Sequence, residues 1–327
     1  MKGNTDIYSR LKFRPYEDDD QPRIIQLWEK AFSKSMPVSV WRWKFHDNPY
    51  GRQMMTCFCQ DEPVALYAGI PYDGNYLGRK VPFTHLMDSM THPEFRGMGI
   101  FVQTYEHFLN EYGGTKTKAF HYGLPGRYHF QLAKKYMSYQ EFPGGQSYLK
   151  ARVSTLSSLK KGYLCNVRKL ESFVPVFDHL QKRLARHFPF AARRDNKFIK
   201  WRFFDHPENN YLIYIYRNML GKIKGYAAVL QQGGRATLSD CYVAPERKII
   251  RTLLNKIGQD LEKRGCADVQ TWLPARHFIT GFLLECGFYA DSEPTGFTPI
   301  WLKKKYCPEY EDAAKNVFFS MADGDLF

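Results

Sequence analysis

Three short segments from the first half of the chain recur in the second half, in the same order. The pairs are WRWKFHDNPYG at Trp41 with WRFFDHPENNY at Trp201, THPEFRGMG around Pro93 with VAPERKII around Pro245, and LPGRYHF around Pro125 with LPARHFI around Pro274. Their offsets are 201 − 41 = 160, 245 − 93 = 152 and 274 − 125 = 149 positions, a drift that loops of different length would produce. A repeat this long predicts two copies of one folded unit and not a solenoid.

Each copy has the same expected succession of elements. In the first, a strand at 11–17 precedes an amphipathic helix at 18–32 with acidic residues in its first turn, and strands separated by turns follow. Then come a glycine turn, a helix, a strand, a helix and a closing strand, and the second copy repeats this order up to a closing strand at 297–305. The pattern predicts an α/β (α+β) fold, with a mixed, largely antiparallel sheet flanked by helices in each unit.

The boundary between the copies is expected near residues 151–164. This stretch, ARVSTLSSLKKGYL, is rich in serine and lysine and lacks a strong apolar period, as linkers do. We therefore expect a first domain at 1–154, a second at 155–305 and a C-terminal tail at 306–327.

Charge and cysteine content narrow the setting of the protein. The 327 residues carry 47 Lys and Arg against 33 Asp and Glu, so the net charge is 47 − 33 = +14. This favours either an anionic partner or a generally basic surface. The seven cysteines lack zinc-site spacing, so we expect no metal and free thiols. With no apolar leader at the start and no apolar run near the ~20 residues of a spanning helix, we expect a cytoplasmic protein with no membrane partner.

The glycine turn is the strongest functional signal. Arg96-Gly97-Met98-Gly99 follows a predicted strand and precedes a predicted helix. Such a turn presents free backbone N–H groups at a helix N-terminus, and glycine lets an anion approach them; the alternative is an ordinary turn that needs positive φ. The Gly-Lys-Ser/Thr of a phosphate-binding P-loop is absent, and Val102 stands where a dinucleotide fingerprint needs its third glycine.

At Thr91-His92-Pro93-Glu94-Phe95-Arg96-Gly97-Met98-Gly99-Ile100, the sequence resembles the acyl-CoA motif V-x-P-x-x-R-G-x-G-I of the GNAT superfamily of N-acetyltransferases. The repeat resembles the tandem-domain members of that superfamily. The resemblance implies acetyl-CoA as co-substrate, with its thioester carbonyl held by a backbone N–H of the preceding strand. It also implies a pyrophosphate site at Phe95, Arg96, Gly97, Met98, Gly99 and Ile100, and acetyl and pantetheine contacts at Ser89, Met90 and Thr91.

The second copy has lost the glycines of this motif. Pro245-Glu246-Arg247-Lys248-Ile249-Ile250 stands in their place, and β-branched side chains would crowd a phosphate. We therefore expect one CoA site, in the first unit, and a second unit that shapes the acceptor pocket or stabilises the first.

The proton-transfer groups are less clearly marked. Family members place an Asn and then a Tyr after the last long strand, but this chain has no such Asn, and Lys134 occupies the position of the Tyr. Tyr128 and Tyr136 are candidate acids or packing aromatics. Asp88 is a candidate base, or it caps a turn or pairs with an arginine. The C-terminal carboxylate of Phe327 is a further candidate, because some tandem members bring the chain terminus into the site; the alternative is a frayed tail.

The sequence thus predicts acetyl transfer from acetyl-CoA to a primary amine by direct attack in a ternary complex. A small amine and a protein lysine both remain open as acceptors, and the oligomeric state is unknown. The alternatives are an aminoacyl- or other acyltransferase of the peptidoglycan-ligase type and a non-catalytic CoA-binding module. A nucleic-acid partner is possible but not favoured. The repeated Trp-Arg segments either stack on an acceptor or, as we favour, belong to the core.

Overall fold

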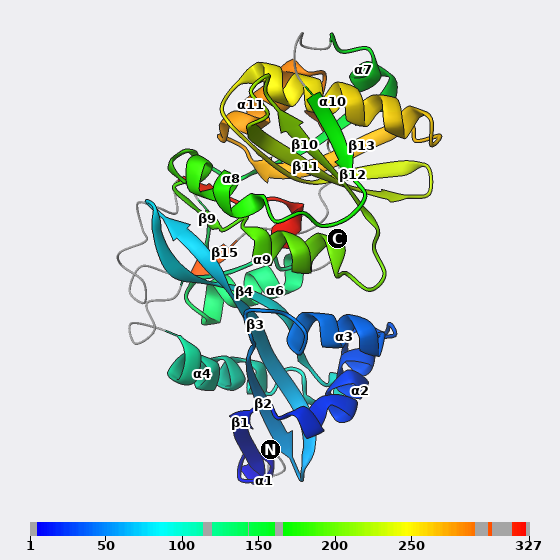
Figure 1. The fold of residues 1–327 in the computed structure, drawn as a ribbon. Helices are drawn as coiled ribbons and strands as arrows, with labels where there is room; N and C mark the ends of the chain where they lie inside the picture. Colours follow the sequence, from blue (N-terminus) through cyan, green and yellow to red (C-terminus); the bar gives the residue numbers. More distant parts are fainter. Residues whose placement is uncertain are drawn as a thin grey trace. The chain divides into compact units, whose positions relative to one another are not determined.

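The computed structural model describes residues 5–113, 120–142, 144–160, 166–291, 300–302 and 316–324 (Figure 1). The chain divides into two compact units. Unit 1 comprises 1–73, 81–141 and 298–311, and unit 2 comprises 74–80, 142–297 and 312–327. The hairpin tip at 74–80 belongs to unit 2 because Gly74–Tyr76 pairs with a strand of that unit at Phe190–Ala192.

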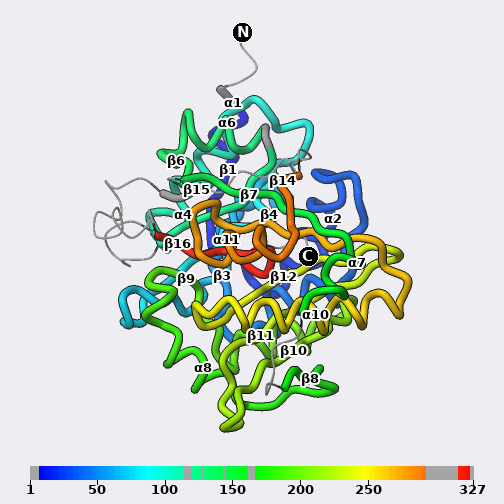
Figure 2. Tube along the Cα trace, turned by 90° about the horizontal axis from the view of Figure 1, so that it is seen from above, coloured from blue at the N-terminus to red at the C-terminus, as the bar shows by residue number. Residues whose placement is uncertain are grey.

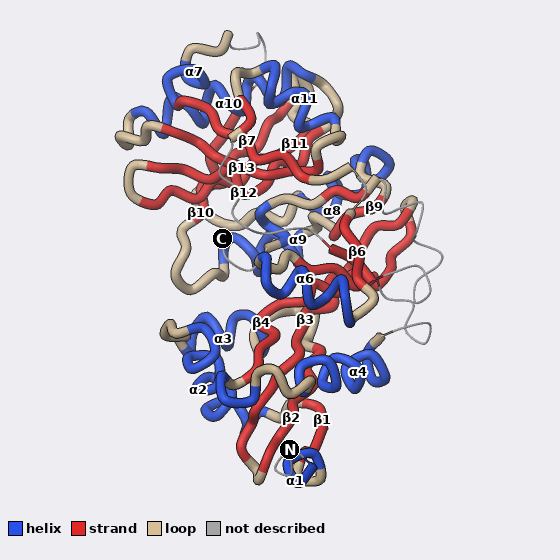
Figure 3. Tube along the Cα trace, turned by 180° about the vertical axis from the view of Figure 1, so that it is seen from behind, coloured by secondary structure: helices blue, strands red, loops and turns tan. Residues whose placement is uncertain are grey.

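Unit 1 is a twisted sheet with helices on both faces. Its elements are α1 (Thr5–Tyr8), β1 (Leu11–Pro15), α2 (Gln21–Phe32), α3 (Val38–Phe45), β2 (Gln53–Cys59), β3 (Glu62–Tyr76), β4 (Arg79–Thr91), α4 (Ile100–Tyr112), β5 (Phe120–Gly123), α6 (Arg127–Tyr136), β6 (Tyr139–Glu141) and β15 (Ile300–Leu302). The strands run in the order β1-β2-β3-β4-β5-β15-β6, with β4 and β5 parallel. Helices α2 and α3 lie on one side of the long strands and α4 on the other (Figures 1 and 3).

Unit 2 repeats this plan. Its elements are β7 (Gln146–Arg152), α7 (Val153–Ser157), β8 (Asn166–Leu170), α8 (Phe177–Leu184), β9 (Phe190–Ala192), α9 (Asn196–Ile199), β10 (Tyr211–Arg217), β11 (Ile223–Gln232), β12 (Arg235–Val243), α10 (Arg247–Glu262), β13 (Asp268–Pro274), α11 (Phe278–Glu285), β14 (Tyr289–Ala290), β16 (Val317–Phe318) and η6 (Met321–Asp323). The strand order is β14-β7-β13-β12-β11-β10-β8, and β12 and β13 are parallel. The mixed α/β fold expected for both units is confirmed.

Each of the two sheets contains strands from both repeats. Strand β15, at Ile300–Leu302, was expected to close the second unit, but it lies between β5 and β6 of unit 1. In the same way β7 lies between β13 and β14 of unit 2. The segment expected to be a linker is also ordered where it is described, because Val153 and Leu156 of α7 are buried. The boundary expected between residues 154 and 155 therefore separates the two copies of the repeat. The compact units follow a different division, because they exchange strands.

The two Trp-Arg segments are core elements. Trp41, Trp43 and Phe45 of unit 1 are buried, as are Trp201 and Phe203 of unit 2. This burial supports the structural role favoured above. Within the described ranges, no helix is both long and apolar enough to cross a membrane.

Candidate active site

The glycine turn has an open outer side and backbone amides without a described acceptor. Gly97 and Gly99 have φ values of +80° and +72°, and a Cβ on either would meet no atom within 4 Å, so their outer side is open. Phe95, Met98 and Ile100 instead turn toward the core around Cys57 and Val64. Among the described residues, the backbone amides of 97–101 donate to no acceptor. These amides lie at the N-terminus of α4, where the helix dipole adds to their attraction for an anion.

Arg96 fixes the turn and does not project from it as a phosphate ligand. Its Nη2 donates to the Ala31 carbonyl in the last turn of α2 at 2.7 Å, and its Nε donates to the Thr91 carbonyl at 3.3 Å. The guanidinium therefore satisfies a carbonyl at a helix end that has no intrahelical partner. Tyr8 adds a second tie, because its hydroxyl donates to the Met98 carbonyl at 3.0 Å. The groups of the turn that stay available to a ligand are therefore its backbone amides.

The strand before the turn extends beyond the end of its parallel neighbour. β4 and β5 pair from Phe83 with Phe120 to Leu86 with Gly123; β5 then ends, while β4 continues to Thr91. Ser89 and Met90, predicted to flank the acyl group, lie on this unpaired continuation. The Ser89 hydroxyl accepts from the Ala68 amide of β3 at 3.2 Å, so it bonds within the sheet. The part of β4 that leads to the glycine turn therefore has no β5 partner.

Asp88 is the centre of a buried polar cluster on this strand. It has a φ of +48°, which places it at an irregular point of β4. One carboxylate oxygen accepts from Trp28 Nε1 at 2.9 Å and the other from Lys44 Nζ at 2.8 Å. The Asp88 and Lys44 side chains are each 6% exposed. These contacts favour the paired role for Asp88, with a lysine and not an arginine as partner, and its role as a base stays a prediction.

Sequence reasoning missed both partners of Asp88, although one signal for them existed. Lys44 lies in the Trp-Arg repeat, where the second copy has Phe204 at 44 + 160 = 204. A charged side chain at a position where its repeat counterpart is aromatic indicates a function specific to the first unit.

The candidate acids lie on α6, which follows the end of β5. Tyr128 is 78% exposed in the first turn of α6 and Tyr136 is 58% exposed at its end. Lys134 pairs with Glu141 at 3.0 Å. His129, which sequence reasoning did not single out, stands edge-on to Phe101 of α4 with ring centroids 5.1 Å apart, and burial lowers its pKa to about 4. The imidazole beside the first turn of α4 is therefore neutral at pH 7. Phe327 lies outside the described residues.

Comparison with known proteins identifies this arrangement. A family model described as an acetyltransferase (GNAT) domain matches residues 12–136. This segment contains the glycine turn, the end of β4 and Asp88. This segment is a GNAT domain. The GNAT resemblance seen in the sequence is thereby confirmed for this segment. A search of curated proteins gave no match.

Solved structures show that the tandem GNAT fold extends over most of the chain. A probable N-acyltransferase of unknown function from Enterococcus faecalis superposes with a TM-score of 0.70 at 12% identity, covering 92% of this chain and 74% of that one. A tandem GNAT protein from the clavulanic acid biosynthesis pathway superposes with a TM-score of 0.58 at 14% identity, covering 89% of this chain and 97% of that one. N-myristoyltransferase of Saccharomyces cerevisiae with bound myristoyl-CoA superposes with a TM-score of 0.55 at 10% identity, covering 90% of this chain and 83% of that one. At these identities the likeness concerns the fold.

The second GNAT-like unit lacks an open turn at the corresponding helix. Ile249 and Ile250 are buried in the first turn of α10, and Glu246 pairs with Lys248 at 3.2 Å. Arg247 pairs with Glu285 at 2.8 Å. The cations that could have attracted a phosphate therefore already have carboxylate partners.

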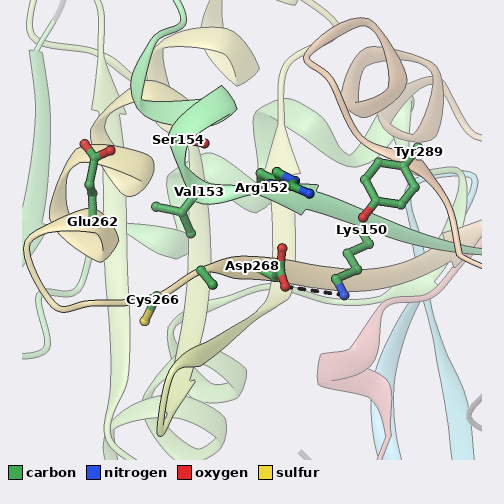
Figure 4. A pocket seen from close by; sticks show the side chains of 9 residues that line it. Lys150, Arg152, Val153, Ser154, Glu262, Cys266, Asp268 and Tyr289 are labelled. Atoms are coloured by element: carbon green, nitrogen blue, oxygen red, sulfur yellow. Dashed lines mark ion pairs between the residues drawn. The ribbon is translucent and has the colours of Figure 1, made fainter.

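Unit 2 also has a surface pocket of about 460 Å³ (Figure 4). It is lined by Lys150, Arg152, Val153, Ser154, Glu262, Cys266, Ala267, Asp268 and Tyr289. Lys150 and Asp268 point toward one another and form an ion pair at 3.4 Å. With charges of both signs on its wall, the pocket does not select one class of ligand.

Proposed function

We propose that this protein transfers an acetyl group from acetyl-CoA to a primary amine. The observation that carries the proposal is the row of backbone amides at 97–101, which have no described acceptor and lie beside two glycines with open outer sides. A pyrophosphate is the anion that such a row suits, because several oxygens can accept hydrogen bonds at once. The pantetheine arm would lie along β4 beyond the end of β5.

The reaction would be a direct transfer in a ternary complex. A backbone N–H of β4 near Met90 would bind the thioester carbonyl and stabilise the charge that develops on its oxygen. The amine nitrogen forms the new C–N bond, the C–S bond breaks, the amine loses a proton and the thiolate gains one. We assign the thiolate proton to Tyr128, because it lies in the first turn after the end of β5. Tyr136 is the alternative donor.

We propose a positioning role for Asp88. Both of its oxygens already accept hydrogen bonds, from the buried Lys44 and the half-buried Trp28, so it would hold the irregular part of β4 in shape. The C-terminal carboxylate of Phe327 then remains the candidate that removes the proton from the amine. The described cysteines are free thiols, which fits our assignment of the reaction to the cytoplasm.

The acyl group and the acceptor need a direct test. Thermal unfolding would be measured with acetyl-CoA, myristoyl-CoA, free CoA and tRNA, because a fold neighbour binds myristoyl-CoA and the chain is basic. A ligand at ~100 times its Kd stabilises the state that binds it by about 2.7 kcal/mol. Mass spectrometry would then follow acetylation of polyamines, amino sugars and lysine peptides.

A matched pair of variants ties the response to the turn. Gly97→Val strains a φ of +80° and blocks the open side, whereas Gly221→Val strains a φ of +72° in a turn of unit 2 that is equally open. We expect only Gly97→Val to lose the acetyl-CoA shift. Equal shifts in both variants would place the cofactor elsewhere, and binding without any acetylated product would favour the CoA-binding module.

A further inference from the structure

Unit 2 has a strand splay at the place where, in unit 1, β5 ends beside β4. β12 and β13 pair only from Arg235 with Asp268 to Thr237 with Gln270, and both strands then continue apart, to Val243 and Pro274. Asp240 on the diverging part of β12 is the repeat counterpart of Asp88, since 88 + 152 = 240. The second unit therefore has a slot between β12 and β13, although it has lost the glycine turn.

The C-terminal segment Val317–Gly324 of the chain fills this slot. η6 lies against both β12 and β13, and β16 pairs in parallel with β9. The Phe319 ring is 5.9 Å from that of Trp272 on β13, and the Phe318 ring is 6.4 Å from that of Tyr242 on β12. Figure 2 shows this segment in red beside β12. Its residues from Val317 to Asp323 are all buried.

The polar contacts recognise a Ser-x-x-Asp turn. The Ser320 hydroxyl donates to Asp240 at 2.8 Å, and its amide donates to Asp323 at 2.8 Å, which closes a capping box. Asp323 accepts two hydrogen bonds from the fully buried Arg194, at 2.9 and 2.5 Å. Arg202, from the second Trp-Arg segment, donates to the carbonyls of Ala322 at 2.9 Å and Gly324 at 3.2 Å.

Charge balance agrees with this fit. The three buried charged residues of the slot, Arg194, Arg202 and Asp240, sum to +1, and Asp323 of the segment neutralises them. Without the segment, a buried guanidinium would lose its bidentate carboxylate partner, which is costly in a desolvated site.

We infer that the splay of unit 2 is a peptide-binding groove whose ligand is the chain's own C-terminal segment. The groove selects an aromatic pair followed by a Ser-x-x-Asp turn, and it takes a peptide where the first unit would take a cofactor. This inference does not depend on the acetyl-transfer proposal, because it rests on contacts within unit 2.

The test uses the full chain and a labelled peptide of residues 317–327. Asp323→Asn weakens the chain's own segment, so the peptide should bind this variant saturably and should not bind the wild-type chain, whose groove is occupied. A peptide with the same Asp-to-Asn change should bind about 100-fold more weakly, as the loss of a buried charge partner implies. Asp205→Asn, at an exposed carboxylate of unit 2, is the control and should behave as wild type.

If Asp323→Asn does not fold, Ser320→Ala replaces it, because that variant keeps the pair between Asp323 and Arg194. Equal binding of the peptide to wild type and variant, or binding to neither, would overturn the inference. So would a second bound equivalent of acetyl-CoA in the variant, since the slot would then be a covered cofactor site. Failure of acetyl-CoA to bind at all would count against the proposed function and leave the peptide result unaffected.

Discussion

The pair formed by Lys44 and Asp88 allows a quantitative prediction. The two side chains are each 6% exposed and their charged atoms lie 2.8 Å apart. At an effective dielectric constant of ~20, the attraction is roughly 332/(20 × 2.8), or about 6 kcal/mol, before the cost of desolvation. Lys44→Met and Asp88→Asn each remove one side of this buried attraction, so each should lower the free energy of unfolding by about 3–5 kcal/mol.

The double variant completes the measurement. With both charges removed, Lys44→Met with Asp88→Asn should lose clearly less than the sum of the single losses, because the two single variants remove the same interaction. Urea unfolding at pH 7 gives the four free energies. A loss below ~1 kcal/mol in each single variant, or additivity within ~0.5 kcal/mol, would refute the reading of this pair as a buried structural contact.

Activity of the same variants separates positioning from catalysis. If Asp88 only holds β4, Asp88→Asn should lower kcat while the shape of the pH profile of kcat/KM stays as in the wild type. Loss of the acidic limb of that profile in Asp88→Asn, with Lys44→Met retaining it, would instead make Asp88 the general base.

Three further perturbations test other parts of the structure. Gly99→Ala and Gly221→Ala place alanine at the same φ of +72°, so each should lower the free energy of unfolding by about 1 kcal/mol. Only Gly99→Ala should lose the stabilisation by acetyl-CoA, and equal ligand shifts in thermal unfolding would contradict this. Burial lowers the pKa of His121 to about 4, so the unfolded state binds a proton before the folded state does as the pH falls below ~6.5. His121 should therefore reduce the free energy of unfolding by about 3 kcal/mol between pH 6.5 and 4. His121→Phe should flatten that pH dependence in chemical denaturation, and an unchanged slope would disprove the assignment. Gly258→Ala would bring a Cβ to 2.4 Å from a backbone nitrogen of α7 and should lower the free energy of unfolding by about 1–3 kcal/mol. Gly281→Ala, on the open face of α11, should be neutral or stabilising, and a comparison of the two melting temperatures with that of the wild type tests both expectations.

Local features of this protein were readable from the sequence because their physical causes are local. Gly97 and Gly99 mark a turn with positive φ before a helix, and such a turn depends on the residues that form it. The repeat predicted two related units because each copy carries its own periodicity and turn residues. The loss of the same glycines in the second copy likewise predicted a single open turn.

The contacts of the site were decided by tertiary structure. Asp88 bonds to donors 44 and 60 positions away along the chain, and no spacing rule distinguishes those partners from others. Sequence reasoning allowed an arginine partner, whereas the fold supplied Lys44 and Trp28, because side chains on α2, α3 and β4 meet only after the sheet has formed.

Strand exchange and the bound C-terminal segment illustrate the same limit. A strand pattern specifies which face of a strand is buried but not which sheet receives it, so β15 could be recognised as a strand and yet be assigned to the wrong unit. Asp323 lies 129 positions from Arg194, and in the sequence it is one acidic residue in a tail. The sequence by itself determined the repeat, the elements and the glycine turn, whereas pairing between distant segments, which depends on burial and charge balance in the folded state, required the tertiary structure.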